Sequence, residues 1–302
     1  MSPLLQKIVT QTIARVRERE ARVPYRELER MASDAPPVRS LAVALSSSFS
    51  VIAEHKRRSP SAGTMNPGNV ARCLGVYSRT QWISAISVLT ELDNFSGELD
   101  DLVAARAACP SKPVLRKDFI TTEYQILEAR AYGADAVLLM AAIHPDPSRL
   151  LSLFEFARDL RMDALLEIGM GGMSPQAMRG MIPEEASIWG INARTFDGSR
   201  LGLRMALSRT LAAVTSRDFR TETGRHGELR SLIPPGKIAV AESGIVTADE
   251  LGSARDTGYD AALIGTAFLK GGTIEDAINR FSPVFLRQAA GSPSSIPSSA
   301  LS

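Results

Sequence analysis

Ala-Val-Leu-Leu-Met-Ala-Ala-Ile, residues 136–143, is the longest uninterrupted apolar run of the chain. It is far shorter than the ~20 residues that a membrane-spanning helix needs. Strands of a parallel sheet are buried on both faces and are therefore continuously apolar rather than alternating. The first part of the run, residues 136–140, is accordingly predicted to be a buried β-strand.

Similar short apolar runs recur on both sides of it. Most are separated by a single helical pattern, for example residues 123–132 or 147–160. The predicted strands are residues 50–54, 83–89, 114–117, 136–140, 164–168, 187–192, 238–243 and 261–264. Eight strand–helix units favour an α/β fold in which one parallel sheet closes into a (β/α)8 TIM barrel.

Three segments fall outside this repeat. Residues 1–49 are predicted to form an N-terminal helical extension packed on the barrel, because Ser2-Pro3 and the apolar residues that follow predict an amphipathic helix. The barrel is assigned to residues 50–285, with an inserted loop near 215–236 in an unusually long connection. Residues 286–302, rich in Ser, Pro and small side chains at their end, are predicted to be a disordered tail.

The composition is that of an ordinary soluble protein. Of 302 residues, 44% are hydrophobic and 23% are charged, and the formal net charge is +2. The sequence lacks a run of basic residues interleaved with aromatic ones, so binding of nucleic acid is not indicated. It also shows no recognisable signal peptide. Cys73 and Cys109 have the spacing of neither a zinc site nor a disulfide framework. We therefore expect a cytoplasmic protein that binds neither nucleic acid nor membrane, and the sequence indicates no particular protein partner.

Charged and polar side chains follow most of the predicted strands, and a barrel of this kind has its active site at the carboxyl ends of the strands. These residues are Glu54 and Lys56, Lys117, Glu167, Asn192 and Arg194, and Glu242 with Ser243. Because strand side chains alternate between two faces, Glu54 and Lys56 share a face, whereas His55 faces the other way. Opposite charges are therefore expected to converge on one mouth of the barrel.

Glycines and hydroxyl groups follow the last two predicted strands. Ser243-Gly244 and Gly265-Thr266 combine glycines, which let the backbone approach an anion closely, with hydroxyl donors. Barrels commonly bind phosphate at this place. The Ser59-Pro60-Ser61 segment after the first strand is either a source of further donors or a plain turn, and we count Ser59 among the candidate substrate-binding residues.

Other kinds of site are not indicated. The segment Gly169-Met170-Gly171-Gly172 lacks the complete dinucleotide-binding pattern, and His55, His144 and His226 share no metal-ligand spacing. The sequence has no G-x-S-x-G elbow and no P-loop. Acid–base chemistry is therefore expected to rest on Lys and Glu side chains, with no metal and no cofactor.

Several longer motifs point to a family. They are VIAEHKRRSPS at 51–61, AISVLT at 85–90, PVLRKDFI at 113–120, GADA at 133–136, Gly190-Ile191-Asn192, and AESGI at 241–245. In these motifs and their order the chain resembles the indole-3-glycerol-phosphate synthase family, the decarboxylating lyases of tryptophan biosynthesis. It departs from the family at Gly169, where His is common, and at Thr195-Phe196, where Asp-Leu is usual.

The resemblance implies roles for the residues at the mouth. Lys117 would be the general acid, Glu167 a general base, and Glu54 with Lys56 a charged pair that assists proton transfer. Substrate contacts are implied for Asn192, Arg194, Glu242, Ser243 and, against an aromatic ring, Phe95 and Phe119. Phosphate contacts are implied for Lys56, Ser243, Gly244, Gly265 and Thr266.

The family's substrate is 1-(2-carboxyphenylamino)-1-deoxyribulose 5-phosphate. Its ketone is protonated while the ring carbon that bears the carboxylate attacks it, after which carbon dioxide and water leave. Glu167 and Glu54 are the alternatives for the base of the dehydration. Two alternatives to the synthase remain. One is a related phosphosugar isomerase barrel, which would need a Cys and an Asp at strand ends. The other is a phosphate-binding barrel without activity that serves as a regulatory subunit.

Overall fold

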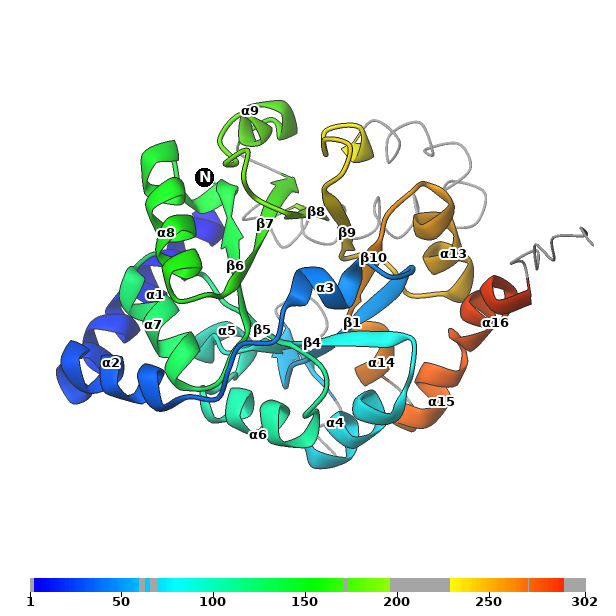
Figure 1. Cartoon of the computed structure of the whole chain (residues 1–302), viewed down its shortest axis with the longest axis horizontal. Coiled ribbons are helices and arrows are strands. Elements are labelled where there is room, and N and C mark those ends of the chain that lie inside the picture. The colour runs from blue at the N-terminus through cyan, green and yellow to red at the C-terminus, as the bar shows by residue number, and fades with distance from the viewer. Residues whose placement is uncertain are drawn as a thin grey trace, which may run out of the picture.

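The computed structural model describes residues 3–59, 63–65, 70–170, 173–195, 229–270 and 272–290. Eight parallel strands close into a barrel in the order β1-β10-β9-β8-β7-β6-β5-β4 (Figure 1). They are β1 (Ser50–His55), β4 (Ile83–Leu89), β5 (Val114–Lys117), β6 (Ala136–Met140), β7 (Asp163–Met170), β8 (Ile188–Thr195), β9 (Ile238–Glu242) and β10 (Ala261–Ile264). The predicted barrel is confirmed, and β4, β5, β6 and β10 have the predicted bounds. A two-stranded pair, β2 (Arg58–Ser59) and β3 (Gly63–Thr64), follows β1.

Helices cover the outside of the barrel. The longer ones are α4 (Val70–Arg79), α6 (Asp100–Ala108), α7 (Glu123–Ala131), α8 (Pro147–Asp159), α13 (Ala248–Asp256) and α16 (Ser282–Ala290). The shorter ones are α5 (Leu92–Phe95), the 3-10 helix η1 (Ala141–Ile143), α9 (Pro175–Arg179), α14 (Thr266–Leu269) and α15 (Ile274–Asn279). Thr122 and Thr247 start α7 and α13 with complete capping boxes, which satisfy backbone amides at each helix start. The largest buried cluster lies between these helices and the strands.

A second buried cluster fills the inside of the barrel and continues into the segment that precedes β1. Leu41 and Leu45 of α3 (Leu41–Leu45) belong to this cluster. The Ser40 hydroxyl and the Ala42 amide donate to the carboxylate of Asp163, the first residue of β7. The helix therefore closes the barrel at the amino-terminal ends of its strands, and Figure 1 shows α3 across the middle of the ring.

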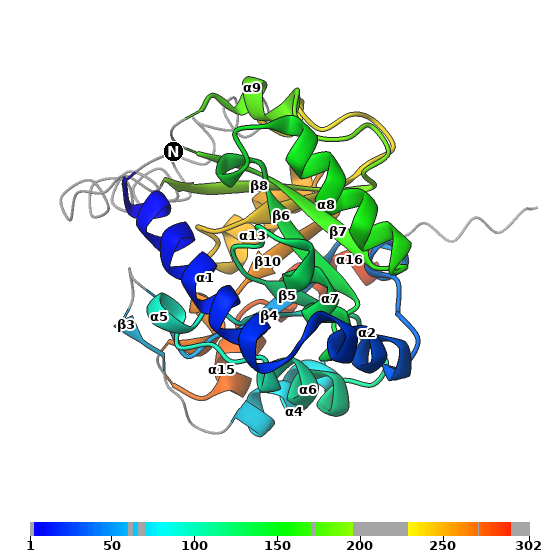
Figure 2. The ribbon, with the colours of Figure 1, turned by 90° about the vertical axis from the view of Figure 1, so that its left-hand side faces the viewer.

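The opposite end of the barrel is covered by α1 (Pro3–Arg22). Leu5 and Ile8 of this helix share the interior cluster with Phe95 and Phe119, which follow β4 and β5. In Figure 2, α1 runs beside α5. Its anchor to α5 is the ion pair of Arg15 with Asp93, at 3.0 Å. The next helix, α2 (Tyr25–Asp34), packs on α7 through a third buried cluster.

The limits of the three predicted segments are only partly described. A helix begins as predicted near the N-terminus, and the division of the chain at residue 49 stays a prediction. The predicted inserted loop lies outside the described residues except for 229–236. Residues 286–290, where the tail was predicted to begin, lie in α16, and residues 291–302 are outside the described residues. No helix within the described ranges has both the length and the apolar character needed to span a bilayer.

Candidate active site

Lys117 is the last residue of β5, and its ammonium group lies between two buried carboxylates. Its Nζ donates to Oε2 of Glu242 at 3.1 Å and to Oε2 of Glu167 at 3.4 Å. These glutamates lie on β9 and β7, so three strands contribute to one cluster. Asn192 on β8 donates from Nδ2 to the same oxygen of Glu167, at 2.9 Å, and fixes that carboxylate from the other side.

A second ion pair comes from the end of β1. Lys56 Nζ lies 2.5 Å from Oε1 of Glu54, and both side chains are almost completely buried. The carboxylate of Glu54 packs on Gly265, where an added β-carbon would lie 2.3 Å from Oε1 of Glu54. Glycine at the end of β10 therefore leaves the space that the Glu54 side chain occupies.

A glycine also makes room for Glu242. On the neighbouring strand β8, a β-carbon added to Gly190 would lie 2.0 Å from Oε1 of Glu242. Gly190 was quoted in a sequence motif, but no function was predicted for it. The sequence does not show which side chain of the next strand lies against this glycine. A glycine inside a predicted strand is the signal that points to such a close approach.

The charges of the cluster and its burial shift the pKa values of Lys117 and Glu242. Three carboxylates (Glu54, Glu167, Glu242) surround two ammonium groups (Lys56, Lys117), so the fully ionised set carries one excess negative charge. Burial alone lowers the pKa of Lys117, but the negative charges of Glu242, Glu167 and Glu54 outweigh it and raise that pKa above its ordinary value. Burial, together with the charge of Glu167 and against the attraction of Lys117, raises the pKa of Glu242 to about 8.

Two carboxylate oxygens of the cluster are buried, and the contact between the Glu242 and Glu167 carboxylates contributes to the raised pKa of Glu242. Oε1 of Glu167 and Oε1 of Glu242 have no hydrogen-bond partner in the described structure. Leaving a buried acceptor without a partner costs about 1–3 kcal/mol, so such atoms call for an explanation. A substrate proton or hydroxyl group at the mouth would satisfy either oxygen.

The predicted phosphate loops lie at neighbouring strand ends. After β9, Ser243 and Gly244 both have positive φ angles, 65° and 83°. A serine in this left-handed region is strained, and such strain is commonly found at functional sites. Gly265 and Thr266 follow β10, which is hydrogen-bonded to β9, and Thr266 begins α14.

The two phenylalanines that were predicted to contact the aromatic ring of the substrate pack on each other. The rings of Phe95 and Phe119 are 6.3 Å apart between centroids and tilted by 36°, and both are buried. Phe95 ends α5, which follows β4, and Phe119 lies two residues after Lys117, the last residue of β5. Ser59 is fully buried in β2. The side chain of Arg194 lies outside the described residues, although its backbone belongs to β8.

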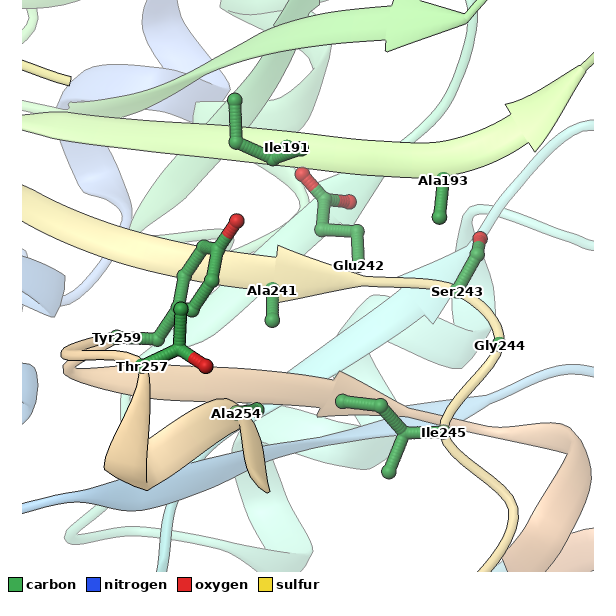
Figure 3. A pocket seen from close by; sticks show the side chains of 10 residues that line it. All are labelled: Ile191, Ala193, Ala241, Glu242, Ser243, Gly244, Ile245, Ala254, Thr257 and Tyr259. Atoms are coloured by element: carbon green, nitrogen blue, oxygen red, sulfur yellow. The ribbon is translucent and has the colours of Figure 1, made fainter. Parts of the chain in front are cut away.

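A small cavity lies beside the end of β9 (Figure 3). Figure 3 shows Glu242 pointing from β9 toward β8, consistent with its contact over Gly190. The cavity measures about 20 Å³, enough for about one water molecule. It is lined by Ile191, Ala193, Ala241, Glu242, Ser243, Gly244, Ile245, Ala254, Thr257 and Tyr259. A phosphosugar does not fit in a cavity of this size.

The described residues offer no cluster of metal ligands, and both thiols lie away from the site. In the ranges that the structure describes, no group of three or more His, Cys, Asp or Glu side chains could hold a metal ion. Cys73 lies in α4 and Cys109 at the end of α6, and both are buried. Neither cysteine is at a strand end.

Comparison with known proteins identifies the family. Residues 5–216 match the family model described as indole-3-glycerol phosphate synthase. Relatives with this name include one from Dehalococcoides mccartyi, which is 36% identical over 269 residues, covering 87% of this chain and 94% of the relative. A second relative, indole-3-glycerol phosphate synthase 2 from Streptomyces coelicolor, is 34% identical over 277 residues, covering 90% of this chain and 96% of the relative.

Solved structures support the fold. The 3-hexulose-6-phosphate synthase from Salmonella typhimurium aligns with a TM-score of 0.55 at 14% identity, over 80% of this chain and 99% of that chain. At this identity the likeness concerns the barrel alone. The match to the family model and the relatives over most of their length show that the chain belongs to the indole-3-glycerol phosphate synthase family.

Proposed function

We propose that this protein is an indole-3-glycerol phosphate synthase that closes the indole ring of 1-(2-carboxyphenylamino)-1-deoxyribulose 5-phosphate with loss of carbon dioxide and water. The family membership supports the reaction. The observation that carries the proposal is the ammonium of Lys117 held between the carboxylates of Glu242 and Glu167. The enzyme is a decarboxylating carbon–carbon lyase, and we propose that it acts in the cytoplasm.

Lys117 is the general acid of the ring closure in this proposal. Its raised pKa keeps it protonated near neutral pH. As the ring carbon attacks the ketone carbon, Nζ gives its proton to the ketone oxygen, which would otherwise become an alkoxide. General acid catalysis of this kind is typically worth about 10²- to 10⁴-fold. Glu242, 3.1 Å away and with a pKa of about 8, is placed to return a proton to Lys117.

Glu167 is the better candidate for the base that takes up a proton as water leaves. Its Oε2 is held by Lys117 and Asn192, whereas its Oε1 is buried without a hydrogen-bond partner and can accept. Glu54 is already engaged with Lys56. We therefore assign the proton transfer of the dehydration to Glu167, and to Glu54 and Lys56 the charged pair that supports it.

The remaining predicted residues hold the substrate in this proposal. The loops with Ser243-Gly244 and Gly265-Thr266 are adjacent and supply amide and hydroxyl donors for the phosphate, together with Lys56. Phe95 and Phe119 supply an apolar wall for the aromatic ring. Asn192, Glu242, Ser59 and Arg194 are proposed to complete the contacts to the sugar and the carboxylate.

The proposal is tested by incubating the purified protein with the carboxyphenylamino-deoxyribulose phosphate and following the fluorescence of the indole product. We expect turnover without added metal or cofactor. A rate at background would reject the synthase activity. Tight binding of a phosphate-bearing substrate analogue without turnover would favour the regulatory barrel instead. The isomerase alternative is disfavoured because Cys73 and Cys109 lie away from the strand ends.

A further inference from the structure

The residues on either side of Lys117 belong to a buried network on the outer face of the barrel. Arg116 is fully buried, in contrast to Lys117, which faces the mouth. Its guanidinium donates to Thr90 Oγ1 at 3.0 Å, to the Gln125 carbonyl at 2.7 Å, to Glu128 Oε2 at 2.9 Å and to Asp118 Oδ2 at 2.8 Å. Such a buried charge is tolerated because opposite charges and hydrogen bonds surround it.

The network also holds the backbone at Lys117. The amide of Thr90 donates to the carbonyl oxygen of Lys117 at 3.2 Å, while the Thr90 hydroxyl donates to Asp118 Oδ2 at 2.6 Å. Asp118 Oδ1 accepts from the amide of Phe119 at 2.8 Å. The chain is therefore held at Lys117 and again two residues later, by the same cluster of side chains.

This support is needed because strand pairing is sparse at the end of β5. Toward β6, the register pairs Leu115 with Ala136 and Arg116 with Val137, and it ends there. Lys117 thus pairs with Leu89 of β4 on one side only. Since a 1 Å misplacement of a reacting group can cost about 10²-fold in rate, the support of this strand end bears directly on the chemistry.

The network continues to the helix that covers the mouth. Arg19 of α1 donates from Nε and Nη2 to the two oxygens of Glu128, at 2.6 and 3.1 Å. The same carboxylate accepts from Arg116. The two arginines are matched in number by the two carboxylates of Glu128 and Asp118.

We propose that Arg116 is a positioning residue. With Thr90 and Asp118 it fixes the backbone of Lys117 and thereby keeps Nζ between Glu167 and Glu242. Arg116 acts through Lys117 and does not touch the substrate. The kinetic part of this inference rests on the proposed synthase function, whereas the hold on the backbone is a property of the fold and can be measured without turnover.

Two variants loosen the network without leaving a buried charge alone. Arg116→Lys keeps the positive charge beside Asp118 and Glu128 but lacks the planar guanidinium group that donates to four oxygens. Thr90→Val removes the hydroxyl group and retains the branched shape. We expect either change to lower kcat by about 10- to 100-fold. KM should change by less than about 3-fold, because the phosphate loops after β9 and β10 are untouched.

The matched control is Arg106→Met. Arg106 belongs to a different buried ion cluster, in which Arg106 and Arg39 both bind Asp135 just before β6, at the amino-terminal end of the barrel. Arg39 still pairs with Asp135 in this variant, and Asp135 keeps its contact with the Val114 amide at the start of β5. The variant should therefore lose stability through one ion pair while kcat stays within about 2-fold. A general loss of rigidity would instead lower kcat in all three variants.

Hydrogen exchange of the Thr90 amide reads the backbone support directly. Peptides that contain Thr90 should exchange at least about 10-fold faster in Arg116→Lys and Thr90→Val than in the wild type, and at the wild-type rate in Arg106→Met. An unchanged kcat or an unchanged exchange rate in both network variants overturns the inference. Absence of synthase activity in the wild type overturns the proposed function instead, and the exchange data then decide alone on the positioning role.

Discussion

Glu242 and Gly190 lie on neighbouring strands, and the Glu242 carboxylate occupies the place where a side chain of residue 190 would begin. A β-carbon there would lie 2.0 Å from Oε1 of Glu242 and 3.3 Å from Leu165. The backbone of Gly190 has an ordinary φ angle, so glycine is needed for space and not for conformation. The orientation of Glu242 toward Lys117 therefore depends on a missing side chain.

Gly190→Ala should displace Glu242 and lower kcat by about 10- to 100-fold, since the acid would lose its nearest carboxylate. Gly252→Ala is the matched control, because Gly252 lies in α13 with open space around its Cα, and alanine is favoured over glycine in a helix by about 1 kcal/mol. Steady-state kinetics and thermal unfolding of both variants check this. Equal rates for Gly190→Ala and the wild type would contradict it.

Lys117→Met should lower kcat at least about 10²-fold, as expected for loss of a general acid. The side chain keeps its length, so substrate binding should change less than turnover. Lys7→Met, at an exposed position of α1, is the control for removing one positive charge. Fluorescence of the indole product measures both rates. A near-normal rate for Lys117→Met would reject the assigned role but not the synthase activity.

Ser243→Gly separates the hydroxyl group from the backbone geometry, because glycine adopts the φ angle of 65° without strain. Loss of a hydrogen bond to a charged phosphate should raise KM by about 10-fold or more, with little change in kcat. Arg161→Gly is the control, because it removes the same kind of backbone strain at an exposed turn before β7, where φ is 60°. It should leave KM unchanged. Equal KM values for Ser243→Gly and the wild type would place the phosphate elsewhere.

Stability should fall on mild acidification because of two buried histidines. Burial lowers the pKa of His55 and of His144 from 6.5 to about 4. Between these values the unfolded chain binds a proton that the folded chain does not, so stability is highest above pH 6.5, falls as the pH drops and levels off below 4. From pH 7 to 5 each histidine should lower the unfolding free energy by about 2 kcal/mol.

His144→Gln tests this pH dependence, since the glutamine amide can replace the contact of His144 Nε2 with the carbonyl oxygen of Ile120. The fall in unfolding free energy between pH 7 and 5 should become smaller by roughly the share of one histidine. Urea unfolding at several pH values provides the measurement. The same slope in the variant and the wild type would mean that His144 is not the titrating group.

Predictions from the sequence were most accurate where local pattern alone decides the structure. The end of β5 at Lys117 follows from a short apolar run that stops at charged residues, and the meeting of Lys117, Glu167 and Glu242 follows because parallel strands end at one mouth. The Gly190–Glu242 contact depends on the register of β8 with β9, which periodicity does not give. Asp118 is only two residues from Arg116, but Thr90 follows β4 and Glu128 lies in α7, so no local spacing indicated these two partners.

The two helices that close the barrel have a consequence for the order of folding. Leu41 and Leu45 of α3 share their buried cluster with Val240 of β9 and Leu263 of β10. The helix α3 precedes every strand of the barrel in the sequence, so it finds its complete apolar environment only after β10 has been made and has paired with β1. Contacts between such distant parts of a chain form slowly. Until then Leu41 and Leu45 of α3 lie in water, where chaperones and proteases can bind them.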